Sequence, residues 1–245
     1  MKSMALRNPN APSDVNALVL GGVPYGDRSR IVRLLTEEHG VVALWVANAR
    51  KDKGLWHPMA ALQVAELTQK KGQGLWQGRG VHRAMPQLGL RNSPERTAVA
   101  FFVAECLALV LHEEGPAEEA FHLALDACML VESAEDVSMI PVHFMAHLVQ
   151  TLGLLPPVAP PSAKGFNVET GEYVWGLGEG KHVLAVPVIA AMVAIPGTKF
   201  DDLRAMNLTR VQRKELALGA FRYIRSQLGL HRELKSYEVL EALFA

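Results

Sequence analysis

The chain has 245 residues, of which 49% are hydrophobic, and its 25 Lys and Arg residues balance 25 Asp and Glu residues. This composition predicts a folded globular protein with room for one large or two small hydrophobic cores. The most apolar runs, residues 98–111 and 183–195, are shorter than the roughly 20 residues that cross a bilayer, and the first twelve residues lack the apolar stretch of a secretory signal. We therefore exclude a membrane protein and expect a cytoplasmic one, in which Cys106 and Cys128 are reduced core thiols.

The balanced net charge hides a strong segregation along the chain. Residues 1–85 contain twelve Lys and Arg against six acids, whereas residues 97–150 contain nine acids and no Lys or Arg. Residues 204–235 are basic again, with eight Lys and Arg against two acids. This pattern predicts a protein that holds a polyanion on one surface and keeps another surface clear of it.

The N-terminal third has the short apolar alternation of β-strands. Five strands are predicted, at residues 17–23, 30–36, 41–49, 62–67 and 75–82. Gly- and Pro-containing turns separate them, as in antiparallel connections. Five short strands in about 70 residues favour a closed five-stranded OB-fold barrel, which we assign to residues 1–86.

After residue 87 the apolar period changes from two to about 3.6. Ser93 and Pro94 form a typical helix start, and helices are predicted at 94–115, 117–132, 138–151, 187–195, 208–228 and 237–244. Asn207 is the expected cap of the helix at 208–228. A Pro- and Gly-rich segment at about 154–182, with a hairpin turning at Thr170–Gly171, interrupts the helices. The fold class is therefore a multidomain α+β protein, with a mostly helical domain at 87–245 that carries this hairpin insertion.

The residue patterns of catalysis are missing from the sequence. His143 and His147 have the i, i+4 spacing of a zinc chelate, but no Glu follows the first His and no third ligand is evident, so we assign both to a half-buried helix face. A G-x-S-x-G nucleophile motif is absent, and the acids have no basic or histidine-rich neighbours with which to form an acid–base pair. We expect a protein that is not an enzyme and that needs no metal or cofactor.

The residue pattern of nucleic-acid binding is present. The segment from Asn48 to His57 interleaves Arg50, Lys51 and Lys53 with Trp56, so that cations can neutralise phosphates while an aromatic face stacks on an unpaired base. The residues expected to contact DNA are Arg28, Arg30, Arg33, Arg50, Lys51, Lys53, Trp56, Lys70, Lys71, Arg79 and Arg83 near the barrel, and Arg222, Arg225, Arg232 and Lys235 near the C-terminus. Charged loops that only keep a small barrel soluble are the alternative for any single cation, and Trp45 and Trp76 are expected in the core.

Several segments also resemble a known family. Residues 17–20, 24–30 and 34–40 resemble the N-terminal signature of the bacterial RecO recombination mediators, and residues 222–225, 228–229 and 234–236 resemble the C-terminal helix and closing motif of that family. Residues 152–156 resemble the segment that precedes the zinc-ribbon-like insertion of the family. These segments occur in the same order and with similar spacing as in the family, and together they extend over most of the chain.

The resemblance implies an OB-fold and a helical domain, binding of single- and double-stranded DNA, and annealing of complementary strands. It also implies contact with the C-terminal tail of the single-stranded-DNA-binding protein, partnership with RecR in loading RecA, and association with the nucleoid. It implies no catalysis. The alternative function is a scaffold whose basic barrel binds an acidic protein instead of DNA.

The insertion departs from the family. Many members carry four cysteines there, whereas residues 159–181 contain none, so a structural zinc is not expected. We expect apolar packing of Phe166, Tyr173 and Trp175 to replace it.

Overall fold

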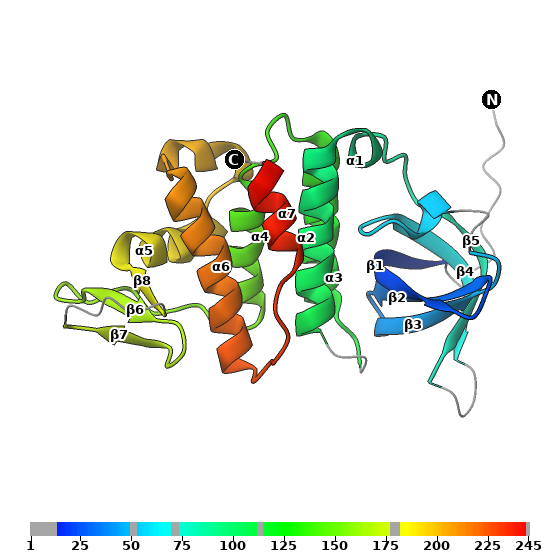
Figure 1. The fold of residues 1–245 in the computed structure, drawn as a ribbon, viewed down its shortest axis with the longest axis horizontal. Coiled ribbons are helices and arrows are strands. Elements are labelled where there is room, and N and C mark those ends of the chain that lie inside the picture. Colours follow the sequence, from blue (N-terminus) through cyan, green and yellow to red (C-terminus); the bar gives the residue numbers. More distant parts are fainter. Residues whose placement is uncertain (1–13, 50–52, 70–73, 112–114, 177–181, 244–245) are drawn as a thin grey trace, which may run out of the picture.

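The computed structural model describes residues 14–49, 53–69, 74–111, 115–176 and 182–243. A β-barrel lies at one end of the molecule, a layer of helices forms the middle, and a small sheet lies at the other end (Figure 1). No helix within the described parts of the chain is both long enough and apolar enough to span a bilayer.

The barrel closes in the order β1-β2-β3-β5-β4, which confirms the predicted OB-fold topology. Its strands are β1 (Val15–Tyr25), β2 (Ser29–Thr36), β3 (Gly40–Val46), β4 (Ala61–Gln69) and β5 (Trp76–Arg83). The ladders are antiparallel except between β3 and β5, where the parallel pair Leu44–Trp76 is the contact that closes the barrel. A register shift in β1 at Gly21, where φ is 146°, adds the local twist that such a small barrel requires.

Strand β1 contributes to two hydrophobic cores. Ala17 and Val19 point into the barrel, where they join residues of β2, β3 and β4. Leu18 and Leu20 point the other way, into the core formed by the helices. A half-exposed strand would alternate apolar and polar residues, so the uninterrupted apolar run of residues 17–20 follows from burial on both faces.

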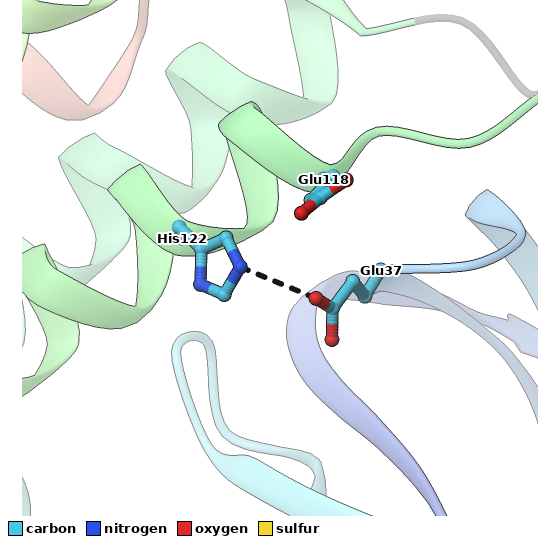
Figure 2. A group of neighbouring side chains, drawn as sticks. All are labelled: Glu37, Glu118 and His122. Atoms are coloured by element: carbon cyan, nitrogen blue, oxygen red, sulfur yellow. Dashed lines mark ion pairs between the residues drawn. The ribbon is translucent and has the colours of Figure 1, made fainter.

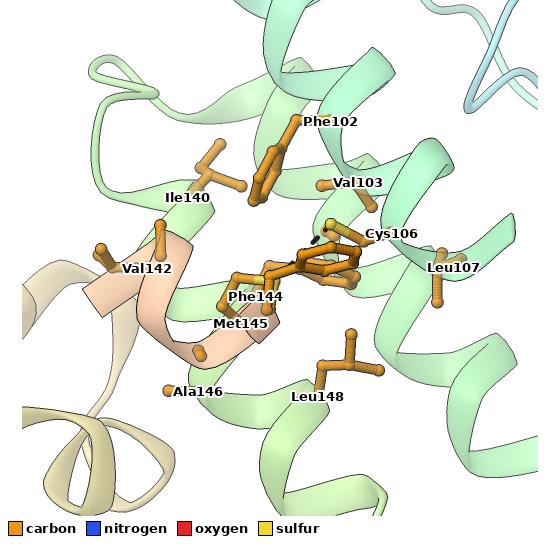
Figure 3. Packing of buried hydrophobic residues seen from close by; sticks show 14 of the residues in the cluster. Phe102, Val103, Cys106, Leu107, Ile140, Val142, Phe144, Met145, Ala146 and Leu148 are labelled. Carbon is orange, nitrogen blue, oxygen red and sulfur yellow. Dashed lines mark hydrogen bonds between the residues drawn. The ribbon is translucent and has the colours of Figure 1, made fainter. Parts of the chain in front are cut away.

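The first four helices form a layer that contacts the barrel. They are α1 (Gly89–Asn92), α2 (Pro94–Val110), α3 (Glu118–Ser133) and α4 (Ile140–Thr151). Of these, α2 and α3 make the contact. Ser93 caps α2 as predicted, because its hydroxyl accepts a hydrogen bond from the backbone of Arg96 at 3.3 Å. Figure 3 shows the centre of this core, in which Phe102 of α2 and Phe144 of α4 are fully buried. The thiol of Cys106 contacts the sulfur of Met145 there at 3.8 Å.

The C-terminal elements surround a small three-stranded sheet. They are β6 (Gly165–Asn167), β7 (Glu172–Val174), β8 (Val183–Ala185), α5 (Val186–Ala194), the 3-10 turns η2 (Ile195–Gly197) and η3 (Phe200–Met206), α6 (Arg210–Gln227) and α7 (Ser236–Leu243). The predicted cap of α6 was wrong. Asn207 adopts a left-handed conformation that ends η3, and Thr209 forms a capping box with Gln212.

The hairpin at β6 and β7 packs in part as predicted. The rings of Phe166 and Tyr173 are 5.1 Å apart, and Phe166 also contacts Tyr223 of α6 at 5.3 Å, both edge to face. The expectation for Trp175 was wrong, since its side chain is 59% exposed and its indole donates a hydrogen bond to Ser162. The hairpin is therefore held to α6 through Phe166.

A buried glutamine joins the barrel to the helices. Gln87, 3% exposed, accepts a hydrogen bond from the backbone N–H of Ala61 at 2.9 Å and donates to the carbonyl of Met59 at 2.9 Å. The same amide donates to the thiol of Cys128 on α3 at 3.0 Å. Burial, with the nearby charge of Glu132 adding to it, raises the pKa of Cys128 to about 12, so the thiol stays protonated. Both cysteines are buried free thiols, as predicted.

His143 makes folding stability depend on pH. Its ring lies on α4 between His147, 4.1 Å away, and Phe200, 5.3 Å away. Burial and then the charge of His147 lower the pKa of His143 to about 4 in the folded protein, against 6.5 for an unperturbed His. Between these two pH values the unfolded chain binds a proton that the folded protein does not, so stability falls as pH decreases from 6.5 towards 4.

We expect this residue to contribute a loss of about 1 kcal/mol between pH 7 and pH 5, after allowance for solvent screening. The measurement compares urea unfolding at both pH values for the wild type and His143→Gln. The exposed His231 supplies the control, as His231→Gln. An identical pH dependence in all three proteins would contradict this role of His143.

Candidate nucleic-acid interface

A groove crosses the barrel where β3 meets β5. Its volume is about 430 Å³, and it is lined by residues 44–49, Leu55, Trp56, Gln77, Gly78, Arg79 and Val81. Strands β3 and β5 share the single pair Leu44–Trp76, so they diverge beyond it and leave space between them. The short helix η1 (Lys53–Trp56) contributes Leu55 and Trp56 to the lining of this space. The groove thus combines aromatic side chains, polar side chains and one arginine.

Arg28 and Arg79 are the predicted DNA-binding cations that the structure exposes near this groove. Arg28 lies in the turn between β1 and β2, and its carbonyl accepts a hydrogen bond from the backbone of Ala49 at 3.1 Å. Because Ala49 lines the groove, this bond brings the turn of Arg28 to the groove's edge. Arg79 lines the groove directly, and its side chain is 84% exposed with Glu66 at 3.6 Å. Such an exposed ion pair is weak enough for a phosphate to compete with the carboxylate.

Three other predicted cations hold the backbone in place. Arg30 donates to the carbonyl of Gly22 at 2.8 Å, and Arg83 donates to the carbonyl of Gly54 in η1. Arg33 donates to the carbonyl of Ala108 at 2.8 Å, in the last turn of α2, where the helix dipole favours a cation. All three are partly buried. These contacts give each of them a structural role.

Part of the predicted basic loops lies outside the described residues. This applies to Arg50, Lys51, Lys70 and Lys71, and the side chain of Lys53 is likewise not described. The residue that precedes each of these segments is described. Ala49, which precedes Arg50, lines the groove, and Gln69, which precedes Lys70, pairs with Trp76 at the start of β5.

The expected role of Trp56 needs correction. Its side chain is 8% exposed and belongs to the barrel core, because η1 turns it inward. It does not offer an open face for base stacking. Trp45, which was expected in the core, is partly exposed and lines the groove together with Asn48 and Gln77. Its position at the end of β3, directly before the basic segment, is the sequence signal that could have identified it.

The C-terminal cations occupy different places. Lys235 lies beside the barrel, in a second groove that it lines with Gly22, Val23 and Ile31. Arg222 is exposed on α6, which packs on α4 and α5 and lies across the helical layer from the barrel (Figure 1). Arg225 pairs with Glu233 at 3.2 Å, and Arg232 is exposed in the following segment. The predicted DNA-binding residues therefore lie in two separate regions.

Several residues of the acidic segment have specific structural partners. Glu105 of α2 accepts hydrogen bonds from the backbone N–H groups of Lys235 and Ser236, at the start of α7. Glu132 accepts from the first two residues of α1 in the same way. These carboxylates satisfy helix N-termini that have no cap of their own, so not all of the acids serve to repel a polyanion.

A basic pocket lies between α4, α6 and α7. It holds a cavity of about 60 Å³, lined by Ser138, Pro141, Val142, Arg210, Arg213, Lys214, Ala217, Tyr237 and Leu240. Arg213 donates to the hydroxyl of Ser138 at 2.9 Å, which fixes one wall. The pocket offers an apolar floor and a cationic rim.

Comparison with known proteins identifies the family. Profiles described as "Recombination protein O N terminal" and "Recombination protein O C terminal" match residues 13–77 and 91–238. The chain belongs to the RecO family. The first match covers most of the barrel, and the second covers α2 to α6 with the small sheet and reaches the start of α7, so the resemblance predicted from short motifs is confirmed over most of the chain.

Relatives named DNA repair protein RecO extend over most of the chain. The protein from Azobacteroides pseudotrichonymphae genomovar. CFP2 is 24% identical over 236 residues, which cover 93% of this chain and 97% of that protein. The protein from Christiangramia forsetii is 21% identical over 238 residues, with coverage of 93% and 97%. That from Anaeromyxobacter sp. strain Fw109-5 is 28% identical over 209 residues, with coverage of 83% and 80%.

Proposed function

We propose that the protein is a recombination mediator that binds single- and double-stranded DNA through the barrel groove and anneals complementary strands. The observation that carries this proposal is the groove between β3 and β5, which has Trp45 on its surface, Arg79 at its edge and the turn of Arg28 beside it. Cations and an aromatic surface are the two components that bind a flexible strand. The basic segments at 50–53 and 70–71 adjoin the same groove in the sequence.

Annealing by this protein needs charge neutralisation and no covalent step. Two DNA strands repel each other through their phosphates, and bound cations reduce this repulsion so that bases can pair. The exposed arginines at the groove can supply these cations, while the sequence offers no nucleophile with an adjacent base. We therefore propose a function without catalysis, in which the barrel at residues 1–86 binds DNA and residues 87–245 bind protein partners.

We further propose that the partners are the acidic tail of the single-stranded-DNA-binding protein and RecR, with which the protein helps to load RecA at the nucleoid. The pocket between α4, α6 and α7 supports a site for the tail, because its cationic rim and apolar floor suit a peptide with both acidic and apolar residues. Family membership supports the remaining partners.

The test is fluorescence anisotropy with a labelled single-stranded oligonucleotide at 50 and 200 mM salt. If the protein neutralises about four phosphates, we expect the affinity to fall about 50-fold between these concentrations. A labelled acidic peptide serves as the second probe: a protein-binding scaffold would bind it at the barrel, so Arg28→Ala combined with Arg79→Ala would weaken peptide binding, whereas a peptide bound in the pocket between α4, α6 and α7 would be unaffected by these changes. Absence of oligonucleotide binding at 50 mM salt would refute the proposed function.

A further inference from the structure

Three side chains with metal-ligating groups meet where the barrel contacts the helices. Glu37 comes from the turn between β2 and β3, and Glu118 and His122 lie four residues apart in the first turns of α3 (Figure 2). One ligating atom from each residue lies within 4.8 Å of the others. These residues are separate from the barrel groove and from the basic pocket, and neither binding site uses them.

The backbone holds both halves of this cluster in place. The N–H of Ala117 donates to the carbonyl of Glu37 at 3.2 Å, which ties the turn directly to the start of α3. Gly40 ends the same turn with a φ of 61°, and a Cβ there would lie 2.1 Å from the carbonyl oxygen of Gly115. Only glycine fits this close approach. The positions from which the three side chains project are therefore fixed relative to one another.

The distances suit a small cation. Ligand atoms around a tetrahedral zinc, each about 2.0 Å from the metal, are about 3.3 Å apart. Nε2 of His122 and Oε1 of Glu37 are already 3.2 Å apart, and Glu118 projects from the preceding turn of the same helix face. The side chains of Glu37 and His122 are 38% and 55% exposed, so an ion can enter without unfolding.

The donor set selects among the cations. One imidazole and two carboxylates favour zinc or a similar transition metal, whereas magnesium prefers oxygen ligands alone. Arg96 is the one Lys or Arg in the described parts of α2, α3 and α4, and it bonds to the carbonyls of Val131 and Ala134 at the opposite end of α3, so it does not neutralise these carboxylates. A divalent cation would balance the charge.

We propose that Glu37, Glu118 and His122 form a zinc-binding site that clamps the barrel to α3. The site uses three protein ligands and leaves the remaining positions to water. It requires no cysteine and is unrelated to the hairpin insertion. Because its ligands come from both sides of the contact between barrel and helices, bound zinc stabilises the relative position of the two parts.

The experiment titrates zinc into untagged protein and measures binding by calorimetry and the midpoint of thermal unfolding. We expect one saturable site per chain, an increase in the midpoint with zinc, and no increase with magnesium at the same concentration. His122→Gln and Glu118→Gln should each weaken zinc binding at least tenfold while retaining the wild-type far-UV spectrum without metal. The inference does not depend on DNA binding, so its failure would leave the proposed function unaffected.

The matched control is His182→Gln. His182 and Glu169 form a pair 3.1 Å apart with side chains 47% and 57% exposed, which is close to the geometry of the Glu37–His122 pair, but the described residues offer this pair no third ligand. This variant should bind zinc like the wild type. The proposal is overturned if the wild type shows no saturable zinc binding, if His122→Gln binds as tightly as the wild type, or if His182→Gln weakens binding equally.

Discussion

Gln87→Leu is expected to destabilise the folded protein by about 2–4 kcal/mol, because leucine fills a similar volume but cannot replace the hydrogen bonds of the amide. The backbone N–H of Ala61 would lose its acceptor in a site that is 3% exposed. Met59 would keep one donor, the thiol of Cys128 at 3.2 Å, so the main penalty falls on Ala61. The loss should appear as a lower urea midpoint.

Gln227→Leu provides the comparison for this effect. Gln227 is exposed on α6, and its amide donates to the carbonyl of Glu169 at 3.4 Å. Removal of an exposed bond of this kind should change stability by less than about 0.5 kcal/mol. Equal urea midpoints for the two variants would show that the hydrogen bonds of Gln87 do not stabilise the contact between the barrel and the helices.

The second large effect is expected at the barrel groove. Replacement of both Arg28 and Arg79 with alanine should weaken oligonucleotide binding about tenfold and reduce the slope of log affinity against log salt by about 1.4, since each phosphate contact to single-stranded DNA contributes about 0.7. Stability should change little, because the one ion pair lost is exposed. Anisotropy titrations at several salt concentrations measure both quantities.

A second double variant with the same change in net charge shows whether the loss of DNA affinity comes from contacts at the groove or from the net charge of the protein. Lys199 and Arg204 are both exposed in and beside η3, and Arg204 pairs with Asp136 at 3.4 Å, much as Arg79 pairs with Glu66. Lys199→Ala combined with Arg204→Ala should leave the affinity within about twofold of the wild type. If both double variants lose affinity equally, Arg28 and Arg79 act only through net charge and the groove is not the binding site.

The sequence predicted elements more reliably than it predicted side-chain roles, and the reason differs between residues. The barrel strands follow from local alternation of apolar residues and from turn residues, which need no tertiary information. Trp56 could not be assigned this way, because a tryptophan among cations is compatible with either a surface loop or a short helix that turns it inward. Arg30, Arg33 and Arg83 bond to carbonyls 8 to 75 residues away, and such partners are set by the fold.

The acidic segment illustrates the same limit. Nine acids without a counter-charge predicted a repulsive surface, yet Glu105 caps a helix that begins 131 residues later in the chain. Likewise, Glu37 and His122 are 85 positions apart in the sequence and meet through the packing of the barrel on α3. Charge composition identified the segment, and only the three-dimensional structure identified the partners of its residues.

The double burial of β1 means that the barrel is not a detachable module. A fragment ending after β5 would present Leu18, Leu20, Leu35 and Val41 to water on one side, since these residues now belong to the core of the helices. An exposed apolar area of this kind promotes self-association. A distortion of the barrel by bound DNA would thus be transmitted through β1 into α2 and α3. For the same reason, the barrel and the helices should unfold together in a single cooperative step.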